Sequence, residues 1–216
     1  MESQQNILTK NELAVLELYR QHPFFKATLK EIQTALKKTS YDWTYKTLKK
    51  FPRLGILNVK IIGRRTRVYF LSLENQKTIY YMGILEQQAV DRAKNLPKNV
   101  INDVTEAVRK ETKHFIILIT GSHVTGTAKT GSDLDLVVIV PTKALKKAVK
   151  PRVVDATILS PVTVDYHLFS DDEVIKMWLW DQANFGKEFF KKHLIFYGIE
   201  AYYELVKEAM HHGFQG

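Results

Sequence analysis

Residues 115–140 read FIILITGSHVTGTAKTGSDLDLVVIV, and this stretch decides the fold. It begins and ends with apolar runs of the length and composition of buried strands. Asp133 and Asp135 open the second run. Because side chains alternate along a strand, both carboxylates are expected on one face, with Cα atoms roughly 7 Å apart. Two such carboxylates beside the Gly121-Ser122 turn predict a site for divalent metals and a phosphate chain.

This stretch also has two other interpretations. Residues 126–132, GTAKTGS, have the glycine spacing of a phosphate-binding P-loop, but Ser132 stands where that motif requires lysine. A P-loop is therefore excluded. The other alternative is an ordinary turn with surface aspartates, because Asp-x-Asp alone is a common pattern. The combination of strand, Gly-Ser, spacing and second strand is much more specific than any one of its parts.

That combination resembles the nucleotidyltransferase superfamily that includes DNA polymerase β, in particular its minimal nucleotidyltransferase branch. The family has a strand, Gly-Ser, about ten residues and then Asp-x-Asp or Asp-x-Glu in a second strand. The matching residues here are Gly121, Ser122, Gly126, Ser132, Asp133 and Asp135. The sequence departs from the family at Thr125, where an arginine is often found, so that arginine's nucleotide contact is not carried over.

The resemblance implies transfer of a nucleoside monophosphate from an NTP to a hydroxyl acceptor, with release of pyrophosphate. It implies two Mg²⁺ ions, with Mn²⁺ as a substitute, and an NTP expected to be ATP. Such ions neutralise the triphosphate, align the nucleophile and stabilise the leaving group. The expected catalytic and metal-binding residues are Asp133, Asp135 and Asp165. The expected nucleotide-binding residues are Gly121, Ser122 and Ser132.

The third carboxylate belongs, by the same resemblance, on a neighbouring strand. Residues 161–169, PVTVDYHLF, alternate apolar and polar side chains with the period of a strand. Asp165 lies on the polar face and is the preferred candidate, with Asp155 as its rival. His167 shares that face, where a lone histidine is more often a surface or packing residue than a catalyst.

The first third of the chain predicts a separate module of three helices and a β-hairpin. Ser40 is a candidate cap for the third helix, and a glycine-basic tip between two apolar runs is a hairpin signal. The expected segments are helices at about 10–21, 29–36 and 40–51, strands at 59–62 and 68–71, and a tip at 63–67. This arrangement resembles a winged helix-turn-helix domain, with the tip as its wing.

Charge supports that interpretation. Residues 1–73 contain 14 Lys and Arg against 5 Asp and Glu, so they carry the whole net charge of +9. Such asymmetry is typical of a module that binds a polyanion, here double-stranded DNA. The expected DNA-binding residues are Thr44, Lys46, Thr47, Lys49, Lys50, Arg64, Arg65 and Arg67. The alternative is a basic helical module used for protein contacts or for forming a homodimer.

The sequence thus predicts an α+β protein in three parts. Residues 1–73 form a winged helix-turn-helix, 74–97 a helical linker, and 98–216 a polymerase β-like nucleotidyltransferase α/β domain with a small mixed sheet and C-terminal helices. The 216 residues include no cysteine, no secretory signal and no apolar run long enough to span a membrane. A cytoplasmic protein from a prokaryote is expected.

A second class of function stays open at this point. The chain can be interpreted as a DNA-binding transcriptional regulator, or as an antitoxin-type protein, whose nucleotidyltransferase domain senses nucleotide or binds a partner (toxin-like) protein. An antibiotic-modifying transferase fits the catalytic half but leaves the basic module without a role.

Overall fold

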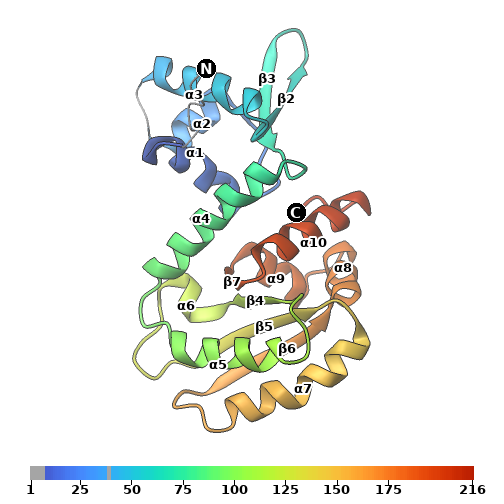
Figure 1. The fold of residues 1–216 in the computed structure, drawn as a ribbon. Helices are drawn as coiled ribbons and strands as arrows, with labels where there is room; N and C mark the ends of the chain where they lie inside the picture. Colours follow the sequence, from blue (N-terminus) through green and yellow to red (C-terminus); the bar gives the residue numbers. More distant parts are fainter. Residues whose placement is uncertain (1–7, 38–39) are drawn as a thin grey trace, which may run out of the picture. The chain divides into compact units, whose positions relative to one another are not determined.

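The computed structural model describes residues 8–37 and 40–216. The chain divides into two compact units, Met1–Leu85 and Glu86–Gly216, and the boundary lies inside helix α4 (Gln76–Arg92). Both units combine helices with a small sheet, so the protein is of the α+β class (Figure 1). Within the described ranges, no helix is both long and apolar enough to cross a membrane.

Three helices open the first unit: α1 (Lys10–Gln21), α2 (Leu29–Ala35) and α3 (Tyr41–Arg53). Each begins after a hydroxyl residue whose side chain accepts a hydrogen bond from a backbone N–H in the first turn, which satisfies one of the otherwise unpaired donors of that turn. These N-terminal caps are Thr9, Thr28 and Ser40. The sequence therefore marks the start of each of these three helices.

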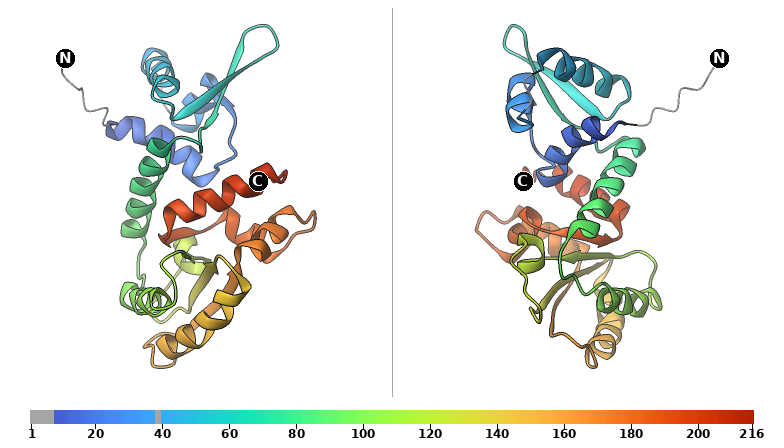
Figure 2. Two further views of the ribbon diagram at one scale, coloured as in Figure 1. Left: turned by 45° about the vertical axis from the view of Figure 1, so that its right-hand side comes forward. Right: turned by 90° about the vertical axis from the view of Figure 1, so that its left-hand side faces the viewer.

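A three-stranded antiparallel sheet completes the first unit, in the order β1-β3-β2. Strands β2 (Leu57–Ile62) and β3 (Thr66–Leu71) form the hairpin expected from the sequence. Figure 2 shows this hairpin extending beyond the helices of its own unit. Strand β1 (Ala27–Thr28) was not predicted, because two residues are too few for a periodic pattern.

One prediction about α3 is wrong. Thr44 and Thr47 were expected at the exposed surface, yet both are buried, with Thr44 fully inaccessible. They share a buried helix face with Leu48 and Phe51, at the spacing of one helical stripe. The Thr44 hydroxyl donates to the backbone carbonyl of Ser40 at 3.0 Å, which allows this polar group to be buried. Neither threonine is available to contact DNA.

A four-stranded mixed sheet forms the centre of the second unit, in the order β6-β5-β4-β7. Strands β4 (Ile116–Ile119) and β5 (Leu134–Val140) are antiparallel, as are β4 and β7 (Leu194–Tyr197). Strand β6 (Val164–Ser170) runs parallel to β5. The two central strands are the two apolar runs from which the fold was predicted.

Helices cover both faces of this sheet (Figures 1 and 2). Helices α5 (Lys98–Arg109) and α7 (Lys143–Thr157) pack together against one face, where valine and isoleucine side chains form the core. The other face carries α8 (Asp171–Leu179), α9 (Phe185–Lys191) and α10 (Ile199–His211), which are rich in aromatic residues. The candidate site lies on this second, aromatic side.

Candidate active site and nucleic-acid surface

Strand alternation turns Asp135 away from the aliphatic core. Leu134, Leu136 and Val138 pack into the core formed with α5 and α7. Because neighbouring residues of a strand point to opposite faces, Asp135 points to the face covered by α8, α9 and α10. Asp133 precedes the first residue of β5 and is exposed. Strand alternation therefore places both carboxylates at the same end and on the same side of this strand.

Gly121 adjoins Asp135 so closely that no other residue type fits without rearrangement. A Cβ on Gly121 would lie 1.9 Å from Oδ2 of Asp135, and the backbone φ of Gly121 is +66°. Only glycine adopts such a φ without strain, so both conformation and space require it. The Thr120 N–H also donates to the Asp135 carbonyl at 3.0 Å, which holds the two strands together here. The expected Gly-Ser turn is the first turn of a short helix, α6 (Gly121–Thr125).

The register of β5 and β6 decides between the two candidates for a third carboxylate. Asp165 is the Cα partner of Asp135 across the parallel pair, so the two side chains emerge side by side on the same face. Asp155 lies exposed on α7, on the far side of the sheet. The fold brings Asp165, and not Asp155, to the Asp-x-Asp motif. His167 Nε2 is 3.9 Å from Oδ2 of Asp165.

The three carboxylates interact electrostatically. Burial raises the pKa of Asp135, and the negative charges of Asp165 and Asp133 raise it further. The side chains of His123 and His167 act in the opposite direction on this pKa. Carboxylates that repel one another in a partly buried place form a donor set that a divalent cation would stabilise.

The carboxylates are not gathered into a ready-made metal cluster. Within the described residues, no group of three or more His, Asp or Glu side chains could hold a metal ion by itself. Magnesium in phosphoryl-transfer sites is bound by one or two carboxylates together with substrate phosphates and water. The donor set therefore fits an ion that arrives with a triphosphate better than a permanently bound structural metal.

A cavity of about 280 Å³ opens beside Asp135 and Gly121. Its other walls include Thr125, Phe185 and Lys192. The Lys192 ammonium group has no carboxylate partner among the described residues. An aromatic ring and a free cation beside the carboxylates suit a nucleotide, whose base stacks and whose phosphates are anionic.

The sequence does not predict these cavity residues, because they carry no motif. Phe185, Glu188 and Lys192 lie about fifty residues beyond Asp135 and reach it only through the packing of α9. Conversely, the expected nucleotide-binding residues Ser122 and Ser132 do not line the cavity. The Ser132 hydroxyl accepts a hydrogen bond from the Lys129 N–H at 2.8 Å and so shapes its own turn.

The first unit presents its basic residues in two places. Arg64, Arg65 and Arg67 are exposed at the tip of the β2–β3 hairpin. On α3, Lys46 lies 2.6 Å from Asp42 and Lys50 lies 2.7 Å from Glu12, so both ammonium groups already have acidic partners. Lys49 is exposed. The hairpin tip is therefore the more concentrated source of unpaired positive charge.

Comparison with known families bears on the second unit. Residues 101–197 match the family model of the nucleotidyltransferase domain. The match begins within α5, ends with β7 and contains Asp133, Asp135 and Asp165. It supports the nucleotidyltransferase superfamily for this unit, and with it nucleoside monophosphate transfer in general. Nucleotidyltransferase domains generally use divalent metals and an NTP. No curated protein and no solved structure matched the chain.

Proposed function

We propose that the second unit is a metal-dependent nucleotidyltransferase that transfers a nucleoside monophosphate from an NTP, expected to be ATP, to a hydroxyl acceptor. The observation that carries the proposal is the position of Asp135, which lies against Gly121 on one side and in register with Asp165 on the other. The family match over residues 101–197 supports the same reaction class.

In this reaction the acceptor oxygen forms a bond to the α-phosphorus while the bond between the α-phosphorus and the bridging oxygen breaks. Pyrophosphate leaves, and Asp165 accepts the proton of the acceptor hydroxyl. Asp133, Asp135 and Asp165 would hold two divalent cations, Mg²⁺ or Mn²⁺, which supply charge neutralisation for the triphosphate and the leaving group. The backbone of Gly121, at the start of α6, would face the triphosphate, whereas Ser122 lies outside the cavity.

The test is transfer from α-labelled NTPs, each supplied with Mg²⁺ or Mn²⁺, into proteins and RNA of a cell lysate. We expect label with the wild-type chain and none with an Asp133→Ala/Asp135→Ala variant. Asp165→Asn should lower transfer by about 100-fold or more, whereas Asp155→Asn on α7 should leave it unchanged. Absence of label with every NTP and both metals would favour the alternative function, a nucleotide-responsive regulator or antitoxin-type protein with a protein partner.

The first unit is proposed to be a winged helix-turn-helix that binds double-stranded DNA through its hairpin. The supporting observation is the exposed cluster of Arg64, Arg65 and Arg67, in the part of the chain that carries the entire net charge of +9. Contacts from Lys46, Lys49 and Lys50 would be secondary, because Asp42 and Glu12 compete for two of them.

Salt dependence tests the DNA proposal directly. The observed binding constant for DNA falls as salt rises, and each lost phosphate contact makes this negative slope of log K against log salt shallower by about 0.9. Replacing the three arginines with alanine should therefore reduce the magnitude of the slope by up to about 3. The matched control replaces three exposed lysines of α7, Lys143, Lys147 and Lys150, with alanine. Equal slopes for the arginine variant and this control would exclude the hairpin as a phosphate contact.

A further inference from the structure

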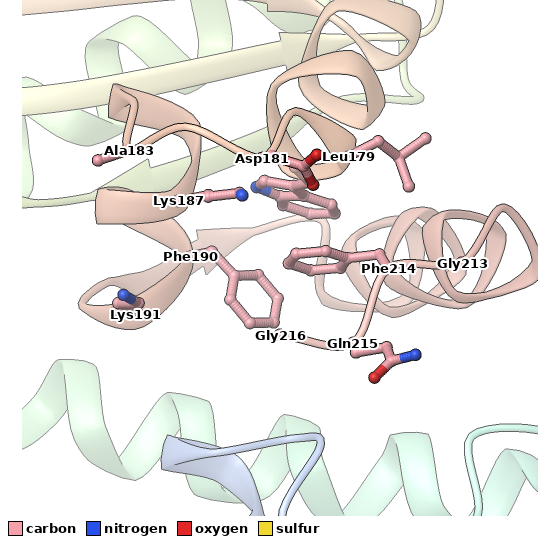
Figure 3. A pocket seen from close by; sticks show the side chains of 11 residues that line it. Leu179, Asp181, Ala183, Lys187, Phe190, Lys191, Gly213, Phe214, Gln215 and Gly216 are labelled. Atoms are coloured by element: carbon pink, nitrogen blue, oxygen red, sulfur yellow. The ribbon is translucent and has the colours of Figure 1, made fainter.

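A second and larger cavity, of about 450 Å³, lies in the second unit outside the candidate active site. Its walls come from the end of α8, the segment after it, helix α9 and residues 213–216 (Figure 3). None of the three aspartates and neither Gly121 nor Ser122 lines it. The volume falls within the range of about 300–1,000 Å³ that is typical of small-molecule sites.

Helix α9 separates this cavity from the one beside Asp135. Lys187, Phe190 and Lys191 face the larger cavity, whereas Phe185 and Glu188 face the smaller one. At 3.6 residues per turn, two residues along a helix correspond to about 200°, so these sets lie on opposite faces of α9. The larger cavity is therefore a separate site and not an extension of the catalytic pocket.

Three aromatic rings form the apolar part of the larger cavity. Trp178 and Phe214 are stacked with ring centroids 5.4 Å apart and an interplanar angle of 12°. Phe190 meets Trp178 at 5.1 Å and Phe214 at 4.9 Å, both edge to face. The Trp178 indole N–H donates to the carbonyl of Gly186 at 3.0 Å, which fixes this ring. The rings are mostly buried, with Phe190 6% and Phe214 8% exposed, so what they present to the cavity is a rigid apolar edge against which a flat ring can pack.

Charged groups surround these aromatic rings. Figure 3 shows Lys187 extending from α9 toward the aromatic rings, with Lys191 one turn further along the same helix. Neither ammonium group has an acidic partner among the described residues. Two free cations on one helix face favour a multiply charged anion such as a phosphate monoester. Asp181, which also lines the cavity, would accept a hydrogen bond from an amino or hydroxyl group of the ligand.

We propose that this cavity binds a small anionic ligand with a flat aromatic ring and hydrogen-bond donors, the chemistry of a nucleoside monophosphate. The ring would lie against Phe190 and Phe214, the phosphate between Lys187 and Lys191, and a hydroxyl or amino group near Asp181. The site needs no divalent metal, since its positive charge comes from lysine. It is separate from the proposed transfer reaction and does not depend on it.

The test is calorimetric titration of the full chain with AMP in the presence of EDTA, which removes divalent cations from the active site. We expect one AMP per chain. Lys187→Ala/Lys191→Ala should weaken binding by about tenfold or more, because two ion pairs with the phosphate are lost. Lys147→Ala/Lys150→Ala on α7 removes the same charge elsewhere and should leave the affinity unchanged. Inorganic phosphate and adenosine should each bind at least about tenfold more weakly than AMP, because phosphate lacks the aromatic ring and adenosine lacks the phosphate group.

Three results would overturn the proposal. AMP that does not bind, or that binds the Lys187→Ala/Lys191→Ala variant as tightly as wild type, would exclude the cavity. Inorganic phosphate that binds as tightly as AMP would show a simple anion site without aromatic recognition. Loss of AMP binding in Asp135→Asn, with no effect of the lysine variant, would place AMP in the catalytic pocket. That last result would leave the proposed transferase function intact, so the two proposals fail separately.

Discussion

Gly121 and Asp135 form a pair in which each residue limits the other. The Asp135 carboxylate occupies the space where any larger residue at position 121 would put its Cβ. A positive φ at Gly121 then directs the chain into α6 directly after β4. A conformational requirement and a chemical one therefore coincide at a single glycine, which explains why Gly-Ser immediately follows the strand.

Gly121→Ala should lower transfer activity by about 100-fold or more, because the added methyl displaces the Asp135 carboxylate by an ångström or more. The comparison is with Gly126→Ala, where φ is +73° but nothing lies within 4 Å of the added Cβ. Both variants are measured for steady-state transfer and thermal unfolding. Equal losses of activity in the two variants would mean that backbone strain, and not displacement of Asp135, is responsible.

At the scale of elements, the joint between α8 and α9 depends on a second glycine. A Cβ on Gly186 would lie 2.5 Å from Cβ of Met177, so α9 packs against α8 at a distance that only glycine allows. We expect Gly186→Ala to lower the free energy of unfolding by about 1–3 kcal/mol through overpacking. Denaturant titration measures this loss, with Glu188→Ala on the exposed face of α9 as the control. A loss no larger than that of the control would show that α8 and α9 separate at little cost.

The carboxyl group of Asp171, at the start of α8, predicts that the stability of the folded chain depends on pH. Burial raises the pKa of Asp171 to about 6, and the charges of Glu208 and Asp172 contribute in the same direction. His114 and Glu204 line the cavity that this carboxyl group faces. Because the folded chain binds this proton more tightly than the unfolded chain, stability falls as pH rises from about 4 to about 6.

Asp171→Asn removes that titration. The variant should be more stable than wild type above about pH 6, by on the order of 1 kcal/mol once solvent screening of this half-buried group is taken into account. The advantage should shrink as pH falls through about 4 and disappear near pH 3, where Asp171 is protonated in both folded and unfolded chains. Thermal unfolding of both proteins from about pH 3 to about pH 8 measures it. A stability difference that does not change with pH would contradict the assigned cause.

The elements also show what could be predicted from sequence. The Asp-x-Asp spacing and the alternation around Asp165 are local patterns, so the strands that carry them could be identified. That Asp165 pairs with Asp135 is a matter of register between strands thirty residues apart, and Lys192 reaches the site only through packing. No local pattern in the sequence indicates either the pairing of these strands or the packing of Lys192. The burial of Thr44 was missed because its hydroxyl suggests an exposed residue, although a hydrogen bond to the preceding turn satisfies it.

At the scale of the whole molecule, the two units differ in charge. Residues 1–73 carry the full net charge of +9, and the remainder, with 18 basic and 18 acidic residues, is neutral overall. Any electrostatic attraction to a polyanion would therefore come mainly from the first unit. The three aspartates Asp133, Asp135 and Asp165 belong to the second unit. A high positive potential there would weaken the binding of divalent cations to their carboxylates. This separation of charge is what the two proposed roles would require, one unit for nucleic acid and the other for a metal-bound nucleotide.

This separation predicts that two sets of substitutions act independently in the same full-length chain. Arg64→Ala/Arg65→Ala/Arg67→Ala should weaken duplex DNA binding by about tenfold or more while transfer from an NTP to a small hydroxyl acceptor stays unchanged. Asp133→Ala/Asp135→Ala should abolish transfer and leave the DNA affinity and its salt slope unchanged. Both activities are measured on each variant at two salt concentrations. If the arginine variant also lost transfer to a small acceptor, the hairpin would have to contribute to catalysis itself, and the assignment of separate roles to the two units would be wrong.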